Sequence, residues 1–124
     1  MWKRLERWQN NFDSGMTKDK YLELCLQIGQ EPSEEKCPPG FEDFPVSLQQ
    51  AIEVFNRLGD RVYPDIGYVG KDYVALPLHM KVVGVEEEEL FLEALVRLDA
   101  HLIKKSAEQM KKARDSAKKK GHGK

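Results

Sequence analysis

Residues 91–103, which read FLEALVRLDAHLI, decide the fold. Their large apolar residues recur every three or four positions, which places them on one face of an α-helix. The face consists of Phe91, Leu95, Leu98 and Leu102, and it is flanked by Leu92, Val96 and Ile103. Residues 86–89 are all glutamate and lysines follow the apolar stretch, so the charges match the helix dipole. We predict a long C-terminal helix that begins near Val85 and frays toward Gly121.

Shorter helices are predicted upstream of this segment. The first covers residues 1–12, where Trp2, Leu5, Trp8 and Phe12 share one face. Thr17 is a suitable N-cap for a second helix, and Gly29 suits its left-handed end. A third helix begins at Pro45, presents Ile52, Phe55 and Leu58, and ends at Gly59.

A fourth, short helix precedes Gly84. Asp72 can cap it, but Pro77 would then fall just past the first turn and cost a hydrogen bond, so a start nearer Leu76 also fits. Between the third and fourth helices, residues 60–71 alternate β-branched and aromatic residues with Pro64, Gly67 and Gly70. Either two very short strands or a tight irregular loop is consistent with that pattern.

A proline-rich loop separates the second and third predicted helices. Residues 30–45 carry four prolines, and Phe41 and Phe44 are expected to pin the loop to the core. The predicted fold class is therefore all-α, with about five helices and a central Pro/Gly-rich region that has room for a tiny β-hairpin. Along the chain we expect an amphipathic N-terminal helix or extension (1–15), a helical core domain (16–105) and a basic, fraying helix end and tail (106–124).

No catalytic constellation can be assembled from the spacing of reactive residues, so we do not expect an enzyme. His79, His101 and His122 form no metal-ligand pattern, and neither a metal nor a cofactor is predicted. Residues 67–71 resemble a phosphate loop only superficially, because Asp65 and Asp72 replace its first glycine and its metal-binding hydroxyl. The two cysteines and the lack of a secretion signal or a long apolar run predict a soluble protein of a reducing cytoplasm, with no membrane partner.

Charge is unevenly distributed although the net charge is only −1. Residues 31–93 hold 14 acidic and 5 basic residues, whereas residues 104–124 hold 9 basic and 2 acidic residues. Clustered cations attract phosphate by releasing counterions, so this end could make non-specific contact with nucleic acid. The candidate residues are Lys111, Lys112, Arg114, Lys118, Lys119 and Lys120. A solubilising helix end is the favoured explanation of the same charges, because charge runs are commonly solvated faces or tails.

Two stretches resemble small bacteriophage proteins. Residues 67–77 (GYVGKDYVALP), followed by an apolar run and residues 83–85 (VGV), resemble the Gly-rich, Leu-Asp-Tyr-x-x-Leu segment of small tail-assembly proteins encoded between the tail-tube and tape-measure genes of long-tailed phages. Lys71 departs from the Gly-Leu-Asp-Tyr form. Residues 16–25 (MTKDKYLELC), with residues 42–45 (EDFP), resemble the opening of small phage proteins of unassigned role.

The resemblance implies a non-catalytic chaperone that keeps tape-measure helices soluble and delivers tail-tube subunits to them. Its partners would then be phage structural proteins, with self-association also possible, and its place the cytoplasm of the infected bacterium. Aromatic residues are the expected partner-binding surface, because they dominate interface energetics when buried: Trp2, Trp8, Tyr63, Tyr68 and Tyr73. For the helix that carries Trp2 and Trp8, docking on the chain's own domain is the other interpretation and the slightly favoured one. The alternatives are a structural component of the virion and a nucleic-acid-associated packaging or regulatory protein that uses the lysine-rich end.

Overall fold

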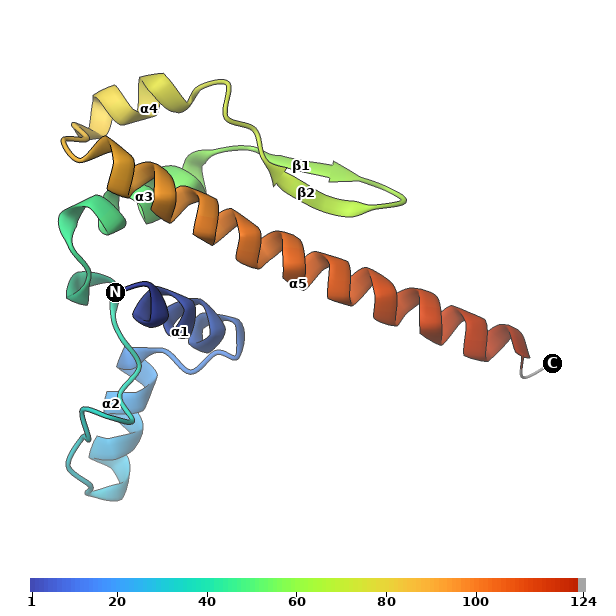
Figure 1. Ribbon diagram of the computed structural model, residues 1–124. Coiled ribbons are helices and arrows are strands. Elements are labelled where there is room, and N and C mark those ends of the chain that lie inside the picture. Colours follow the sequence, from blue (N-terminus) through green and yellow to red (C-terminus); the bar gives the residue numbers. More distant parts are fainter. Residues whose placement is uncertain (123–124) are drawn as a thin grey trace. The chain divides into compact units, whose positions relative to one another are not determined.

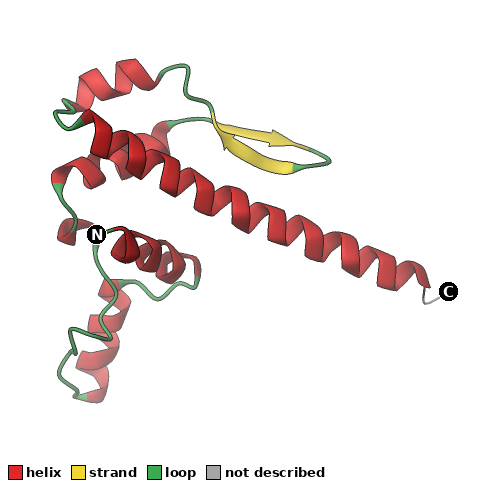
Figure 2. Ribbon diagram, in the orientation of Figure 1, coloured by secondary structure: helices red, strands yellow, loops and turns green. Residues whose placement is uncertain are grey.

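The computed structural model describes residues 1–122 and is mainly helical (Figure 1; Figure 2). Over that range it contains five α-helices, one short 3-10 helix and a two-stranded antiparallel sheet. The predicted long C-terminal helix and the small hairpin are thus confirmed, and the fold is mainly α with a small sheet. The chain divides into two compact units, Met1–Gln49 and Gln50–Lys124.

The N-terminal unit begins with two helices whose ends follow the predicted signals. Helix α1 spans Trp2–Asp13, and α2 spans Lys18–Ile28. The Thr17 hydroxyl accepts a hydrogen bond from the Lys20 backbone N–H at 3.4 Å, which satisfies one of the unpaired donors of the first turn. Gly29 follows α2 with φ of 70°, a left-handed conformation that glycine adopts without steric cost. Both predicted caps of α2 are confirmed.

The proline-rich loop after α2 is held in place at several points. Phe44 is buried and meets the Trp8 ring edge-on, with 6.2 Å between ring centroids. The Ser33 backbone N–H donates to the Tyr21 hydroxyl, and an Arg7 guanidinium N–H donates to the Glu35 carbonyl. The predicted anchoring role is confirmed for Phe44. The loop ends with the short 3-10 helix η1 (Phe41–Asp43).

Helix α3 (Val46–Arg57) starts directly after Pro45, as predicted, and continues into the C-terminal unit. There it is followed by strands β1 (Asp60–Tyr63) and β2 (Gly67–Lys71) and by helices α4 (Leu76–Val83) and α5 (Glu88–His122). The buried apolar side chains of this unit come from α3, the turn after it and α5: Ala51, Ile52, Val54, Phe55, Leu58, Phe91, Ala94, Leu95 and Leu98. The apolar faces predicted for the third and last helices therefore form the core.

Two predicted helix starts differ from the structure. Helix α4 begins at Leu76, so the start at Asp72 is wrong and the later alternative is confirmed. Asp72 accepts a hydrogen bond from the Val74 N–H instead, which forms a local turn before the helix. Helix α5 begins at Glu88 and not near Val85, because the backbone first turns at Gly84, which has φ of 72°.

The β-hairpin lies along α5 in close backbone contact. Its strands pair antiparallel with an irregularity between Arg61 and Val62. Gly67 has φ of +88°, and a Cβ there would come within 2.8 Å of the Ser106 Oγ, so this position of the strand leaves no space for a side chain. The Tyr68 N–H donates to the same Ser106 hydroxyl at 3.0 Å.

Asp99 of α5 fixes the hairpin through three donors. The side chain is only 6% exposed, and its carboxylate accepts hydrogen bonds from the Lys71 backbone N–H at 3.0 Å, from the Tyr68 hydroxyl at 2.5 Å and from the Tyr73 hydroxyl. Burial, followed by the hydrogen bond to Asp99, raises the pKa of both tyrosine hydroxyls. Both phenols therefore remain protonated and can donate to the carboxylate across the physiological range.

Lys71 connects the same strand to the start of the hairpin. The side chain is 8% exposed, and its ammonium lies 2.6 Å from the Asp60 carboxylate and 4.5 Å from the centroid of the Phe55 ring. It also donates to the Leu58 carbonyl at 3.3 Å. These partners compensate the desolvation of a buried ammonium group.

Replacing Asp99 with Asn should destabilise the C-terminal unit. The amide NH2 would face hydroxyl donors, and hydrogen bonds to a charged acceptor would be lost, so we expect unfolding to become easier by about 2–3 kcal/mol. Urea denaturation measures this change. Asp115→Asn, an exposed position on the same helix, is the matched control and should change stability by less than about 0.5 kcal/mol. Equal effects of the two substitutions would show that Asp99 does not anchor the hairpin.

Candidate protein-binding surfaces

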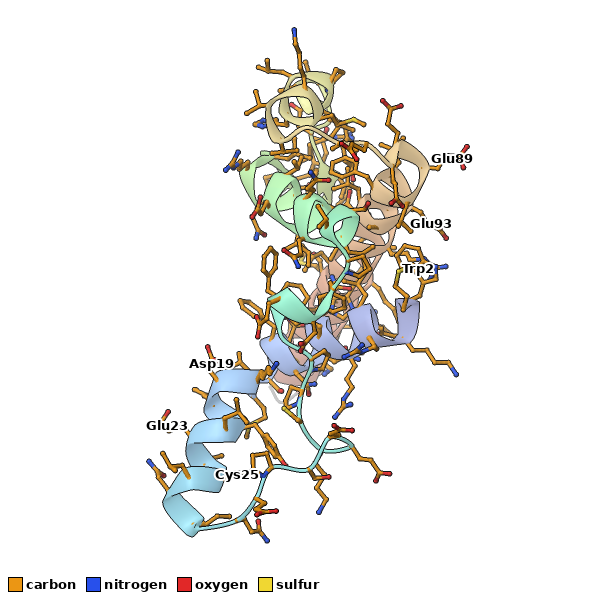
Figure 3. The ribbon with its side chains drawn as sticks, turned by 90° about the vertical axis from the view of Figure 1, so that its left-hand side faces the viewer. Trp2, Asp19, Glu23, Cys25, Glu89 and Glu93 are labelled. Atoms are coloured by element: carbon orange, nitrogen blue, oxygen red, sulfur yellow. The ribbon has the colours of Figure 1, made fainter. Side chains whose placement is uncertain are left out.

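The predicted aromatic surface is divided between packing and exposure. In α1, Trp8 and Phe12 have ring centroids 5.9 Å apart, and Trp8 also contacts Phe44, so Trp8 contributes to the packing of the N-terminal unit. Trp2 is half-buried and lies at the other end of α1 (Figure 3). Both tryptophans are partly buried, so neither is presented in full to a partner.

The three tyrosines of the hairpin region do not form one surface. Tyr68 and Tyr73 both donate their hydroxyls to Asp99, so the structure brings these two side chains together to hold the hairpin on α5. Tyr63, at the end of β1, is 49% exposed, and its exposed apolar neighbours are Val62 and Ile66. The hairpin tip, more than Tyr68 or Tyr73, is the part of this region that presents apolar atoms to solvent.

Helix α2 carries the most exposed apolar residues of the N-terminal unit. Cys25 is the one buried residue within this fully described helix (Figure 3). Four apolar side chains remain exposed along it: Leu22, Leu24, Leu26 and Ile28. Leu26 is 84% exposed and Ile28 66%. The sequence pattern predicts a helix here, but it does not reveal which of these apolar side chains are exposed.

Helix α4 is a second apolar helix with little burial. None of its eight residues, all of which are described, is buried, and Leu78 and Val82 are exposed one turn apart. Its C-terminal end is held by the Gln50 side-chain amide, which donates to the Val83 carbonyl at 3.0 Å. Helix α4 is therefore fixed by polar contacts at its end while one apolar face remains open.

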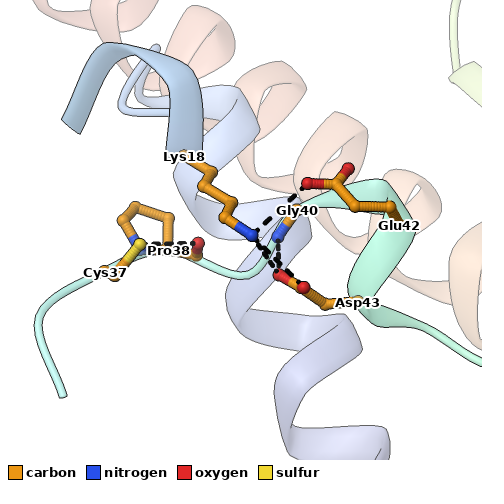
Figure 4. A network of polar contacts seen from close by, with 6 residues as sticks. All are labelled: Lys18, Cys37, Pro38, Gly40, Glu42 and Asp43. Atoms are coloured by element: carbon orange, nitrogen blue, oxygen red, sulfur yellow. Dashed lines mark hydrogen bonds and ion pairs between the residues drawn. The ribbon is translucent and has the colours of Figure 1, made fainter. Parts of the chain in front are cut away.

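A polar network holds the loop against the start of α2 (Figure 4). The Lys18 ammonium lies 3.0 Å from Asp43 and 3.3 Å from Glu42, and Asp43 also accepts from the Gly40 N–H at 2.8 Å. The hydrogen bond from Gly40, and then the one from Lys18, lowers the pKa of the Asp43 carboxyl. Asp43 in turn raises the pKa of Lys18. Sequence reasoning missed this network.

Beside this network the N-terminal unit has an open concavity of about 690 Å³. Arg4, Arg7 and Lys18 contribute positive charge to its lining, and Glu34 and Asp43 contribute negative charge. Lys18 is already paired with Asp43, and Arg7 donates to the Glu35 carbonyl. The opposite charges largely offset each other, so the concavity does not favour an anionic or a cationic ligand.

The basic end of α5 is exposed as far as its side chains are described. Lys111, Arg114 and Lys118 follow one another at intervals of three and four residues and therefore share one face of the helix, while Lys112 lies elsewhere on it. The helix backbone continues through Lys119 and Lys120, but the side chains of these two candidates lie outside the described part. The three cations on one face are a contiguous basic surface.

Residues 1–122 contain neither a metal-binding cluster nor a membrane-spanning helix. No group of three or more His, Cys, Asp or Glu residues in this range is placed to hold a metal ion. No helix of the described chain combines the length and the hydropathy needed to cross a membrane. Comparison with known protein families, with curated proteins and with solved structures found no match.

Stability should depend on Asp43 in a pH-dependent way. A pKa that is lowered on folding contributes stability above the unfolded value of about 4, and that contribution is lost as the pH falls through the folded value. Asp43→Asn should therefore cost about 1 kcal/mol near neutral pH, and the cost should decrease as the pH falls below about 4 toward the lowered folded value. Urea denaturation as a function of pH tests this.

Glu42→Gln is the matched control, because Glu42 pairs with the same lysine but its side chain is 69% exposed. It should have a smaller effect that changes little with pH. A constant cost of Asp43→Asn across the pH range would contradict the role of the carboxylate charge.

Proposed function

We propose that this chain is a non-catalytic protein that binds another protein during assembly of a phage tail or virion. The observation that carries the proposal is the exposed apolar surface of α2. Leu22 and Leu26 lie one turn apart on one side of the helix, and Leu24 and Ile28 lie one turn apart on nearly the opposite side. Burying one such leucine or isoleucine contributes about 1.5–3 kcal/mol, so a partner that covers both Leu22 and Leu26 gains substantial affinity. Exposed apolar side chains that share one helix face suit a protein-binding site.

An apolar helix surface suits a helical partner. Amphipathic helices bind by packing apolar residues at helical spacing against another apolar surface. Leu22 and Leu26 are one turn apart on α2, which is the spacing such a partner would require. The tape-measure protein implied by the resemblance is a long helical protein of this class, and we propose it as the client.

The two resembling stretches fit this proposal in different ways. Residues 16–25 form the N-cap and most of α2 and include Leu22, whereas Leu26 of the proposed surface lies directly after this stretch. Residues 67–77 contain both tyrosines that bind Asp99, which gives that stretch a role in holding the hairpin. The chaperone would then use α2 for binding and residues 67–77 for its own structure.

A second candidate, nucleic-acid contact, rests on the basic surface of Lys111, Arg114 and Lys118. Phosphate contacts by such cations are sequence-independent, and the affinity falls steeply with salt. Reversing charge at these positions should abolish retention on duplex DNA at low salt if this function holds. The same variants should leave capture of a client by α2 unchanged.

Capture of the client from phage-infected cells should require α2. The tagged full chain should recover tape-measure or tail-tube protein, identified by mass spectrometry, and should itself be absent from purified virions. Leu26→Glu should lower recovery by about tenfold or more, because a carboxylate would enter an apolar interface. Gln27→Glu adds the same charge at a neighbouring exposed position of α2 and should have little effect.

Other outcomes would redirect the proposal. Presence of the chain in finished virions would favour a structural component over a chaperone. Recovery of packaging or host proteins alone, or equal recovery by Leu26→Glu and Gln27→Glu, would contradict the proposed client or the proposed surface.

A further inference from the structure

Helix α5 has a second face beside its packed one, on which every residue is exposed, although Ile103 borders the hairpin near Gly70. Its members recur at helical spacing over about 38 Å of the helix. They are Glu89, Leu92, Val96, Ala100, Ile103, Ala107, Lys111 and Arg114, and all eight are exposed. Val96 is 65% exposed, although it lies in the middle of a row of apolar and small residues. We refer to these eight residues as the open face of α5.

The helical spacing of the open face is compatible with pairing about a twofold axis. The intervals between successive members are three, four, four, three, four, four and three residues, and this series reads the same in both directions. The centre of the series lies between Ala100 and Ile103. A helix face of this kind superposes on itself when it is turned end over end, which is the relation between the two halves of a twofold-symmetric antiparallel helix pair.

The charges of the open face match the same arrangement. Glutamate stands at one end, at Glu89, and arginine at the other, at Arg114, with the acidic stretch 86–89 before the first and lysines around the second. Figure 3 shows Glu89 projecting away from the helix. An antiparallel pair places each glutamate opposite the partner's arginine, whereas a parallel pair would place like charges opposite each other.

We propose that the open face of α5 is a self-association surface on which a second copy of this chain packs antiparallel. The twofold axis passes between Ala100 and Ile103. The facing pairs are then Val96 with Ala107 of the other copy, and Ala100 with Ile103 of the other copy. The small residues Ala100 and Ala107 allow the helix axes to approach closely, and Lys111 covers Leu92 of the other copy with the methylene groups of its side chain.

The surface is independent of the one proposed for client binding. The open face lies on α5 in the C-terminal unit, whereas the client surface lies on α2 in the N-terminal unit. A variant of one surface should therefore leave the function of the other intact. A chain that captures the client but forms no dimers would contradict the self-association proposal alone. A chain that forms dimers but captures no client would contradict the client proposal alone.

Sedimentation equilibrium of the full chain at increasing concentration tests self-association. The wild type should form dimers, and Val96→Glu should raise the dimer dissociation constant by at least about tenfold, because a carboxylate would be buried next to apolar residues. Val82→Glu makes the same change at a valine of α4 that is 68% exposed, and it should leave the constant unchanged. Circular dichroism of both variants should show that the helical content is retained.

A charge exchange tests the orientation of the two copies. Glu89→Arg and Arg114→Glu should each weaken the dimer, and the double variant should restore it, since opposite charges again face each other. A wild-type chain that stays monomeric at every concentration overturns the proposal and leaves the open face to another protein's helix. Dimers that are insensitive to Val96→Glu, or a double variant that is weaker than both single ones, overturn it as well.

Discussion

Asp99 is only 6% exposed, so its carboxylate has lost most of its hydration on folding. Three hydrogen-bond donors of the protein replace the lost contacts with water. One donor is the Lys71 backbone in β2, and the others are the hydroxyls of Tyr68 and Tyr73 on either side of it. This single side chain of α5 therefore determines where the hairpin lies and in which direction the chain leaves it toward α4. A buried charge binds its donors strongly, because any loss of a donor leaves the charge uncompensated.

The anchoring of the hairpin explains which of its residues are exposed. Tyr68 and Tyr73 must turn their hydroxyls toward α5 in order to reach Asp99, and Gly67 must lack a side chain so that the strand can approach Ser106. Tyr63, on the strand that does not make these contacts with Asp99, remains exposed. The exposure of the hairpin residues thus follows in part from the hydrogen bonds that Asp99 accepts.

Local signals predicted most of the helices, and long-range pairs were the part that could not be predicted. The helical spacing around Phe91, the cap at Thr17 and the left-handed ends at Gly29 and Gly84 act within a few residues, so a sequence pattern reports them directly. Tyr68 and Asp99 are 31 residues apart, and no periodicity relates them. Asp99 nevertheless gave one usable signal, since it borders the apolar face of Leu95, Leu98 and Leu102, where a carboxylate requires donors from elsewhere.

Exposure was the other property that the sequence pattern did not determine. An apolar residue at helical spacing is expected to be buried, yet Leu26 and Val96 are exposed. Periodicity predicts which face of a helix is apolar. Only the tertiary structure shows whether that face is buried. The unassigned apolar faces of α2 and α5 are therefore the places where the structure adds most to the sequence.

Two proposed roles compete for the basic end of α5, namely contact with nucleic-acid phosphate and pairing with the acidic end of a second copy. Lys111 and Arg114 are exposed and can be neutralised either by phosphate or by the glutamates of a second copy. The two possibilities depend differently on salt, because phosphate binding rests on counterion release, whereas an antiparallel pair of helices also buries apolar side chains that salt does not screen. Self-association would also occupy the cations that nucleic acid needs, so the two interactions would compete for the same residues. The apolar row between the charged ends favours a protein partner, because a surface that bound only phosphate would have no use for Val96 and Ile103.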